Sequence, residues 1–229
     1  MFAIVDARAP QKAIDTLKDY ASDILLFNSK DITYNSISGH PDIFIYQDTN
    51  ELIIAPNSPK ILFDFFHSQN IRYKMGTTPI GTTSSDSVFY NCLSSGKYFF
   101  HKRNHSDDRI IQAVKNNIKI FLPQAYTRCS MIPIDANNYV TSDKGIEKVL
   151  INKGFNTFYF SPDKIQIQDH KNGFIGGTCG MYNDKIFFLG NILFHKDGEQ
   201  LQKFLNNLNV EIVTLNDDYL YDGGSIIFV

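Results

Sequence analysis

The segment His40-Pro41-Asp42 holds the pair of side chains best suited to acid–base chemistry in this sequence. An imidazole two residues before a carboxylate could transfer protons or hold a cationic substrate. The same segment is typical of a turn in which the aspartate accepts a hydrogen bond from its own backbone. Because both interpretations fit, His40 is a candidate for catalysis and for ligand binding, and Asp42 is a candidate for ligand binding.

The thiols of the chain are Cys92, Cys129 and Cys179. Their odd number and wide spacing fit neither a disulfide framework nor a CxxC zinc or redox motif, so we expect a reduced chain in the cytoplasm. Cys129 and Cys179 could each act as a nucleophile. A free cysteine is more often a small buried residue, so a catalytic role for either thiol is an alternative and not the leading hypothesis.

Further polar candidates lie where strands are expected to begin. Four glycines between Gly173 and Gly180 would let the backbone approach a ligand closely, or would form a tightly packed bulged strand. Neither a dinucleotide fingerprint nor a phosphate-binding loop is present, and no histidines have metal-ligand spacing, so we expect no cofactor and no metal. The remaining candidates for ligand binding are Asn91, Thr178, Asp222 and Ser225, with Asp86 as a weaker one.

Two other polar features are better explained as solvated loops. His195 lies between an expected strand and the helix that begins at Asp197; it could reach a pocket rim, but a solvated loop is the better interpretation. The densest run of charge covers residues 101–109 and could contact an acidic partner or nucleic acid. Its own aspartates and the helix that follows favour a solvated loop here too.

The overall composition is that of an ordinary globular chain. In 229 residues the hydrophobic fraction is 43%, and 22 Lys and Arg against 24 Asp and Glu give a net charge of -2. A protein that binds phosphate backbones would be basic, so nucleic-acid binding is not expected. No stretch has the length and hydrophobicity of a membrane span or a signal peptide, so we expect no membrane association. The oligomeric state is not indicated by the sequence.

A repeat of about 46 residues positions these side chains. Five short apolar strands are expected, with equivalent places taken by Ile4, Leu52, Tyr98, Tyr139 and Ile186. Each is followed by a helix whose start is marked by proline or aspartate, at residues 10, 59, 107, 143 and 197. Each helix leads into another strand, at residues 23–27, 71–75, 118–122, 157–161 and 210–215.

In four units a further strand comes first, at residues 41–46, 87–92, 129–134 and 173–182. The first unit lacks this strand, and the one strand left over is residues 224–229. If it pairs with residues 2–6, five ββαβ units close into a ring that leaves no open edge at the closure. We therefore predict a single α/β domain over residues 1–229, a five-bladed propeller with pseudo-fivefold symmetry. A doubly wound sheet with hairpin insertions is the alternative.

Several short phrases resemble an uncharacterised bacterial family with the pentein fold, a ring of five units closed by the C-terminal strand. They are His40-Pro41-Asp42, residues 141–146, residues 173–177 and residues 222–225. The fold is that of arginine and agmatine deiminases, dimethylarginine hydrolases, amidinotransferases and the ribosome anti-association factors. In its enzymes the resemblance implies a central channel in which a carboxylate, a general-base histidine and a cysteine nucleophile after a C-terminal Gly-Gly pair act on a guanidinium group.

Two of these three roles are vacant in this chain. No cysteine follows Gly223-Gly224, where the residues are Ser225, Ile226 and Ile227, and residues 127–130 contain no histidine. Losing the nucleophile removes essentially all covalent catalysis of the usual kind. The compatible residue is Asp42, which could hold a guanidinium group.

The leading hypothesis is therefore a pentein-like protein that binds a small polar ligand, guanidino or amino-acid-like, in its central channel without the usual Cys-His machinery. One alternative is a hydrolase of a C–N bond that uses Cys179 or Cys129 with His40 and Asp42. The other is a macromolecular binding module of the ribosomal type. Whether the chain is an enzyme stays open at this point.

Overall fold

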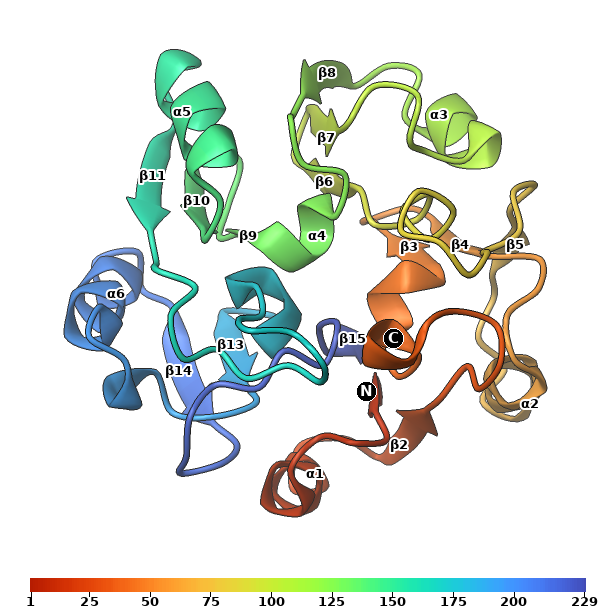
Figure 1. Cartoon of the computed structure of the whole chain (residues 1–229), viewed down its shortest axis with the longest axis horizontal. Coiled ribbons are helices and arrows are strands. Elements are labelled where there is room, and N and C mark those ends of the chain that lie inside the picture. Colours follow the sequence, from red (N-terminus) through yellow and green to blue (C-terminus); the bar gives the residue numbers. More distant parts are fainter.

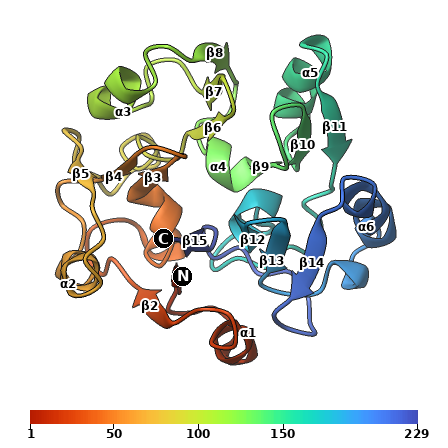
Figure 2. The same cartoon turned by 180° about the vertical axis from the view of Figure 1, so that it is seen from behind.

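A computed structural model describes residues 1–229 as a ring of five three-stranded sheets around a common centre (Figure 1). The main helices lie on the outside of the ring, and both chain termini lie near its middle, as the view from behind also shows (Figure 2). The sheets, in spatial order, are β15 (Ile227–Phe228), β1 (Phe2–Asp6) and β2 (Asp23–Phe27); β3 (Ile45–Gln47), β4 (Leu52–Ile54) and β5 (Lys74–Met75); β6 (Leu93–Ser95), β7 (Tyr98–His101) and β8 (Ile118–Phe121); β9 (Met131–Pro133), β10 (Asn138–Thr141) and β11 (Asn156–Tyr159); and β12 (Cys179–Tyr182), β13 (Lys185–Phe188) and β14 (Glu211–Thr214).

The first sheet is completed by the two ends of the chain. Strand β15 pairs antiparallel with β1, with Ala3 opposite Phe228 and Ile4 opposite Ile227. Beyond this pair, the Phe2 N–H donates to the Val229 carbonyl at 2.8 Å and the Val229 N–H donates back at 3.0 Å. The predicted closure of the ring is confirmed, and the doubly wound sheet is excluded because each sheet contains one antiparallel and one parallel pair.

Each blade carries one helix between its second and third strands. These helices are α1 (Gln11–Leu17), α2 (Lys60–Ser68), α3 (Asp108–Ala113), α5 (Lys144–Asn152) and α6 (Gly198–Asn206). The carboxylates of Asp107 and Asp143 cap α3 and α5 by accepting the N–H groups of Arg109 and Ile146. Asp197 precedes α6 but does not cap it; its Oδ2 accepts the Ser161 N–H at 2.9 Å instead.

The inner strands begin later than the sequence predicts, and the strand predicted at residues 87–92 is wrong, because β6 begins only at Leu93. Short helical segments occupy the predicted strand starts: η2 (Pro41–Ile43), α4 (Thr127–Ser130) and η3 (Ile175–Thr178), with a turn at 89–90 in the remaining blade. Proline fixes the backbone of η2, and glycines relax that of η3. Segments η2 and α4 bring Asp42 and Cys129 into contact near the centre of the ring. Strand β5 is also shorter, because residues 71–73 do not pair.

Neighbouring blades share their hydrophobic cores. The largest cluster joins strands of the first three sheets through the fully buried side chains of Ile4, Phe44, Ile53 and Phe99. Two smaller clusters join the last blade to its two neighbours around Phe187 and around Phe188. Because packing passes from blade to blade, the ring behaves as one structure that can hold residues from distant segments in fixed positions.

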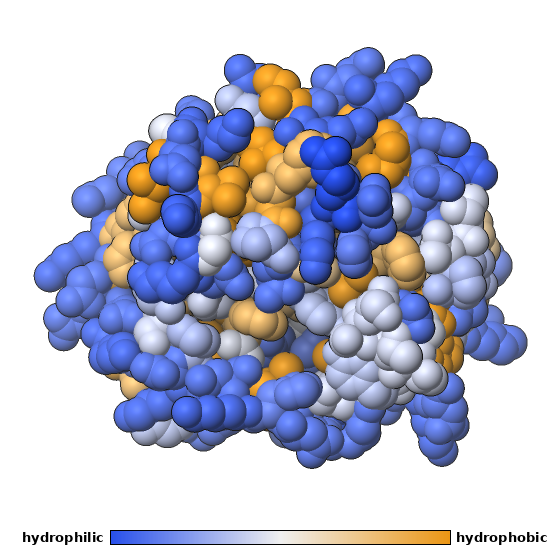
Figure 3. Space-filling model, turned by 45° about the horizontal axis from the view of Figure 1, so that its top comes forward, coloured by the Kyte–Doolittle hydropathy of each residue, from blue (hydrophilic) through white to orange (hydrophobic).

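The face of the molecule drawn in Figure 3 is mainly hydrophilic. Orange hydrophobic groups in Figure 3 are separated by blue side chains and form no broad continuous patch on that face. Among the exposed large hydrophobic residues are Ile118, Phe121 and Ile151, on blades at the top of Figure 1. None of the helices combines the length and apolar character that crossing a bilayer requires.

Candidate functional site

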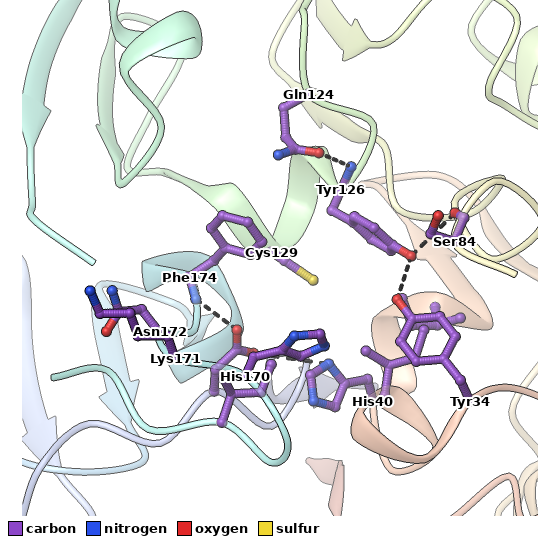
Figure 4. A pocket seen from close by; sticks show the side chains of 14 residues that line it. Tyr34, His40, Ser84, Gln124, Tyr126, Cys129, His170, Lys171, Asn172 and Phe174 are labelled. Carbon is purple, nitrogen blue, oxygen red and sulfur yellow. Dashed lines mark hydrogen bonds and ion pairs between the residues drawn. The ribbon is translucent and has the colours of Figure 1, made fainter. Parts of the chain in front are cut away.

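A cavity of about 580 Å³ lies near the centre of the ring, and its side chains come from several blades (Figure 4). Its buried end is formed by His40, Cys129 and Asp222. Tyr34 and Tyr126 form one wall, and their hydroxyl groups are hydrogen-bonded to each other at 2.7 Å. A cavity of this size with a few convergent polar groups is suited to a small molecule.

Cys129 is held by two hydrogen-bonding neighbours at the buried end. Its Sγ donates to Asp42 Oδ2 at 2.9 Å and lies 3.1 Å from Asn91 Nδ2, which donates to it. Asn91 also accepts the Cys129 N–H at 3.1 Å, so the amide fixes both the backbone and the thiol. The hydroxyl of Ser225 donates to the same Asp42 oxygen at 3.1 Å. Four residues that are far apart in the sequence thus form one buried network.

The thiol of Cys129 is a poor nucleophile in this state. Burial and the adjacent carboxylate of Asp42 raise the pKa of Cys129 well above its usual value. The thiol is therefore protonated near neutral pH and acts as a hydrogen-bond donor. Replacement of that proton by a cation, or approach of a cationic ligand, would be needed to favour the thiolate.

Asp222 and His40 form the second half of the buried end. His40 Nδ1 lies 3.9 Å from Asp222 Oδ1, and the Asp222 carboxylate accepts the N–H groups of Phe174 at 2.7 Å and Gly224 at 3.1 Å. Burial raises the pKa of Asp222, and nearby His40 opposes this rise. No lysine or arginine forms an ion pair with Asp42 or Asp222.

Three side-chain atoms at this end are buried without any hydrogen-bond partner: both ring nitrogens of His40 and Oδ1 of Asp42. Buried polar atoms are nearly always paired, because an unpaired one loses its hydration without compensation. Such a concentration of unpaired atoms beside a cavity points to a group that they are arranged to bind.

The glycines of the inner segments let backbone pack against these side chains. Gly224 has φ +68°, and a Cβ at this position would collide with His40. A Cβ at Gly177 would collide with the carboxylate of Asp222. Of the two interpretations of the glycine-rich segment, tight packing is the one that the structure supports, because Gly177 packs against the Asp222 carboxylate.

Five of the predicted ligand-binding or catalytic residues do not line this cavity. Three of them, Asp42, Asn91 and Ser225, belong to the buried network behind Cys129, whereas Thr178 and Cys179 lie outside both the cavity and the network. Thr178 donates its hydroxyl to the Ile175 carbonyl at 2.7 Å and is fully buried. Cys179 lines a separate, smaller cavity of about 110 Å³, and its nearest acceptors are carbonyl oxygens at 3.9 Å. Burial raises the pKa of Cys179, and no side-chain base accompanies it. The structure thus groups Cys129, and not Cys179, with His40 and Asp42.

The weaker candidates also lie elsewhere. Asp86 is exposed and accepts the Thr83 hydroxyl at 2.6 Å. The prediction that His195 lies in a solvated loop is wrong: it is 8% exposed and stacks on Phe160 at 4.1 Å between ring centroids. Stacking on Phe160 buries the face of the imidazole ring, and its Nδ1 accepts the Asp197 N–H at 3.0 Å.

The charged run at residues 101–109 is only partly solvated. His101, at the end of β7, is buried between Phe99 and Phe121, with ring centroids 4.6 and 5.3 Å away. Asp107 is buried as well and accepts two N–H groups from the preceding blade's Thr77 and Thr78. The run is thus anchored at two points by packing and hydrogen bonds, and its middle is solvent-exposed.

Several cavity residues were missed by sequence reasoning. Besides the wall tyrosines, the lining includes Ser84, His170 and Phe174 from loops that connect neighbouring blades. The His170 Nε2 and Ser36 hydroxyl are 2.9 Å apart. No repeat or motif marks Ser84 and His170, and Phe174 lies in the phrase 173–177 without being a candidate, so only their place in the ring brings these residues to the cavity.

Comparisons with known proteins give the family and the fold. A family model described as "Family of unknown function (DUF6873)" matches residues 4–227. No curated protein matches the sequence. Among solved structures, agmatine deiminase of C. jejuni superposes with a TM-score of 0.59 at 11% identity, covering 95% of this chain and 86% of that chain.

Two further structures agree with this result. A mutant of DDAH from Pseudomonas aeruginosa complexed with citrulline has a TM-score of 0.56 at 9% identity, covering 95% of this chain and 91% of that chain. An amidinotransferase from Microseira wollei in the saxitoxin biosynthetic pathway has a TM-score of 0.57 at 10% identity, with coverages of 95% and 88%. The fold is the pentein fold of the guanidine-modifying enzymes, as the sequence predicted.

Proposed function

Because the chain belongs to the DUF6873 family and has the fold of guanidine-modifying enzymes, we propose that it binds a small cationic molecule of guanidino or amino-acid type in the central cavity. The observation that carries this proposal is the buried carboxylate of Asp222, which borders the cavity without a lysine or arginine partner. A guanidinium group placed there would form charge-assisted hydrogen bonds and compensate the buried charge.

The walls of the cavity support the same ligand class. Tyr34, Tyr126 and Phe174 supply aromatic surface on which a planar cation can rest. Closer to the opening, Gln124 and Asn172 supply amide groups that could hold an α-carboxylate or α-amino group. The proposed ligand thus has a planar cationic end toward Asp222 and a polar end toward the opening.

Calorimetry and thermal unfolding with three related compounds test this proposal. L-arginine and agmatine should raise the unfolding midpoint of the protein, whereas L-citrulline, which lacks the positive charge, should raise it much less. At a ligand concentration about 100 times the dissociation constant the stabilisation is about 2.7 kcal/mol.

Two variants separate the cavity from the rest of the surface. Asp222→Asn should abolish the preference for the cation, and Asp86→Asn, at an exposed carboxylate outside the cavity, should leave it unchanged. Equal effects of L-arginine and L-citrulline, or unchanged L-arginine binding by the Asp222→Asn variant, would contradict the proposal.

A second candidate function follows from the contact between Cys129 and Asp42. Their 2.9 Å separation places a base next to a thiol at the cavity, so Cys129 could attack a guanidino or amidino carbon while Asp42 takes its proton. Ammonia release from guanidino compounds would report this activity. It should disappear in Cys129→Ser and persist in Cys179→Ser; no release by the unmodified protein with any of the compounds above would count against hydrolysis of that class.

A further inference from the structure

The most unusual feature of the cavity is the grouping of three different metal-ligating side chains. One ligand atom each from His40, Asp42 and Cys129 lie within 4.8 Å of one another, and all three residues are buried. Asp42 and Cys129 are 87 positions apart in the sequence, so no ligand spacing is visible there. The group exists because η2 and α4 turn toward the same centre from two different blades.

His40 and Asp42 have unpaired ligand atoms, whereas Cys129 Sγ is hydrogen-bonded to Asp42 and Asn91. Neither ring nitrogen of His40 has a partner, and Oδ1 of Asp42 has none either. A structural role for the group would pair these atoms with protein donors or acceptors, since leaving them buried and unpaired is costly. A cation bound between them would satisfy the imidazole and the carboxylate together.

We propose that His40, Asp42 and Cys129 form a binding site for a divalent transition-metal ion of the zinc class. An imidazole, a thiolate and a carboxylate are all zinc ligands, whereas magnesium and calcium are bound by oxygen atoms. With metal–ligand bonds of about 2.0 to 2.3 Å, ligand atoms of a tetrahedral site lie about 3.3 to 3.8 Å apart. In the group as it stands, no pair of ligand atoms is more than 4.8 Å apart, and Cys129 Sγ and Asp42 Oδ2 are 2.9 Å apart. Adjustments of about 1 Å would bring the three atoms to the tetrahedral spacing.

The balance of charge also fits a dication. On binding, the S–H bond of Cys129 breaks, its proton leaves to solvent, and a metal–sulfur bond forms. The thiolate and the Asp42 carboxylate together neutralise the two charges of the ion. Asp222 is not one of the three metal ligands and stays available to a cationic ligand. Because its Oδ1 lies 3.9 Å from His40 Nδ1, the metal and the proposed ligand would occupy neighbouring positions at the buried end of the cavity.

Three protein ligands leave a fourth position of a tetrahedral ion open. Cys129 and His40 both line the cavity, so water or a bound ligand could reach the ion from there. Zinc sites with three protein ligands and one open position are those that carry out chemistry, whereas structural sites use four protein ligands. The geometry therefore favours a catalytic zinc site over a structural one.

Titration of the full-length protein with Co²⁺ and Zn²⁺, after treatment with a chelator and without any organic ligand, tests the site. Co²⁺ should bind at one ion per chain and produce a thiolate-to-cobalt charge-transfer absorption in the near ultraviolet, which Zn²⁺ then displaces. Mg²⁺ should neither bind nor displace. The Cys129→Ala, Asp42→Asn and His40→Gln variants should each bind at least about 100-fold more weakly.

Matched controls are available for each kind of ligand. Cys179→Ala removes another buried thiol, and Asp86→Asn removes a carboxylate outside the group; both should retain the absorption band and the affinity. If the ligand variants do not fold, the test uses the unmodified protein and measures how far Zn²⁺ protects its cysteines from alkylation. Zn²⁺ should then slow alkylation of Cys129, mapped by mass spectrometry, without slowing that of Cys92.

Absence of the charge-transfer band, its persistence in Cys129→Ala, or equal protection of Cys129 and Cys92 would overturn the proposal. Failure of the guanidino compounds to bind would leave it standing, because the titration contains none of them. Failure of the metal titration would likewise leave the ligand proposal standing, since Asp222 is not one of the three metal ligands.

Discussion

A disulfide between the first and last strands tests the closure of the ring on which the cavity depends. The register places Ala3 opposite Phe228, next to the pair Phe2 and Val229, which exchange two hydrogen bonds. Ala3 and Phe228 therefore form a non-hydrogen-bonded pair, with Cα atoms expected about 4.5 Å apart. This separation lies at the lower end of the range that a disulfide spans, so Ala3→Cys with Phe228→Cys should form a cross-link on oxidation.

The expected gain in stability is large because the cross-link closes nearly the whole chain. A loop of about 225 residues loses enough entropy in the unfolded state to stabilise the folded state by about 5 kcal/mol. The reduced double variant will be less stable than the unmodified protein, because Phe228 packs on Phe187 with ring centroids 5.0 Å apart. Comparing the oxidised and reduced forms of the same variant removes this loss from the result.

Urea unfolding of the two forms measures the gain, and peptide mapping identifies the cross-link. The single variants Ala3→Cys and Phe228→Cys are the controls, because neither can form the cross-link alone. If the double variant does not form the disulfide while folded, or if oxidation changes the free energy of unfolding by less than about 1 kcal/mol, the closure of the ring by β15 is refuted.

Two further predictions concern single residues. Burial lowers the pKa of His101 to about 4, so the unfolded chain binds a proton more readily than the folded protein between pH 6.5 and 4. The free energy of unfolding should be highest above pH 6.5 and fall by about 2 to 3 kcal/mol as the pH drops to 4, and His101→Phe should remove most of this fall; an equal fall in both proteins would exclude the explanation. Gly224→Ala combines a left-handed backbone with a collision against His40, so thermal unfolding should show a loss of stability of more than about 2 kcal/mol. The control is Gly154→Ala, where the backbone is left-handed but no atom lies within 4 Å of the added Cβ, and the expected loss is about 1 kcal/mol. Equal losses at the two glycines would show that the contact with His40 is not significant.

The repeat in the sequence was enough to predict the architecture. Apolar strands at a spacing of about 46 residues, each followed by a marked helix start, are local patterns that depend on burial of one face. The closure of the ring also followed from the sequence, because a strand left over at the C-terminus had only one unit without a partner. The pairing of this strand with β1 confirms the prediction.

The sequence was less informative where polar residues interrupt the strands. Pro41 and the glycines of η3 are compatible with a strand start and with a helical turn, so the local sequence does not decide between the two. The burial of His195 could not be predicted from the local sequence either, because the aromatic ring of Phe160 that buries it comes from the preceding blade.

What the sequence determined by itself is therefore the ring, because it follows from residue types at regular intervals. The resemblance to the pentein enzymes added that the cysteine expected after Gly223-Gly224 is absent. What only the tertiary structure decided is which polar residues meet. Asp42 and Cys129 lie 2.9 Å apart, whereas Thr178 and Cys179 are excluded from the cavity, although all four occupy similar places in their repeats. The physical reason is that a contact across the centre depends on how two different blades turn at their inner ends, and no local pattern records that relation.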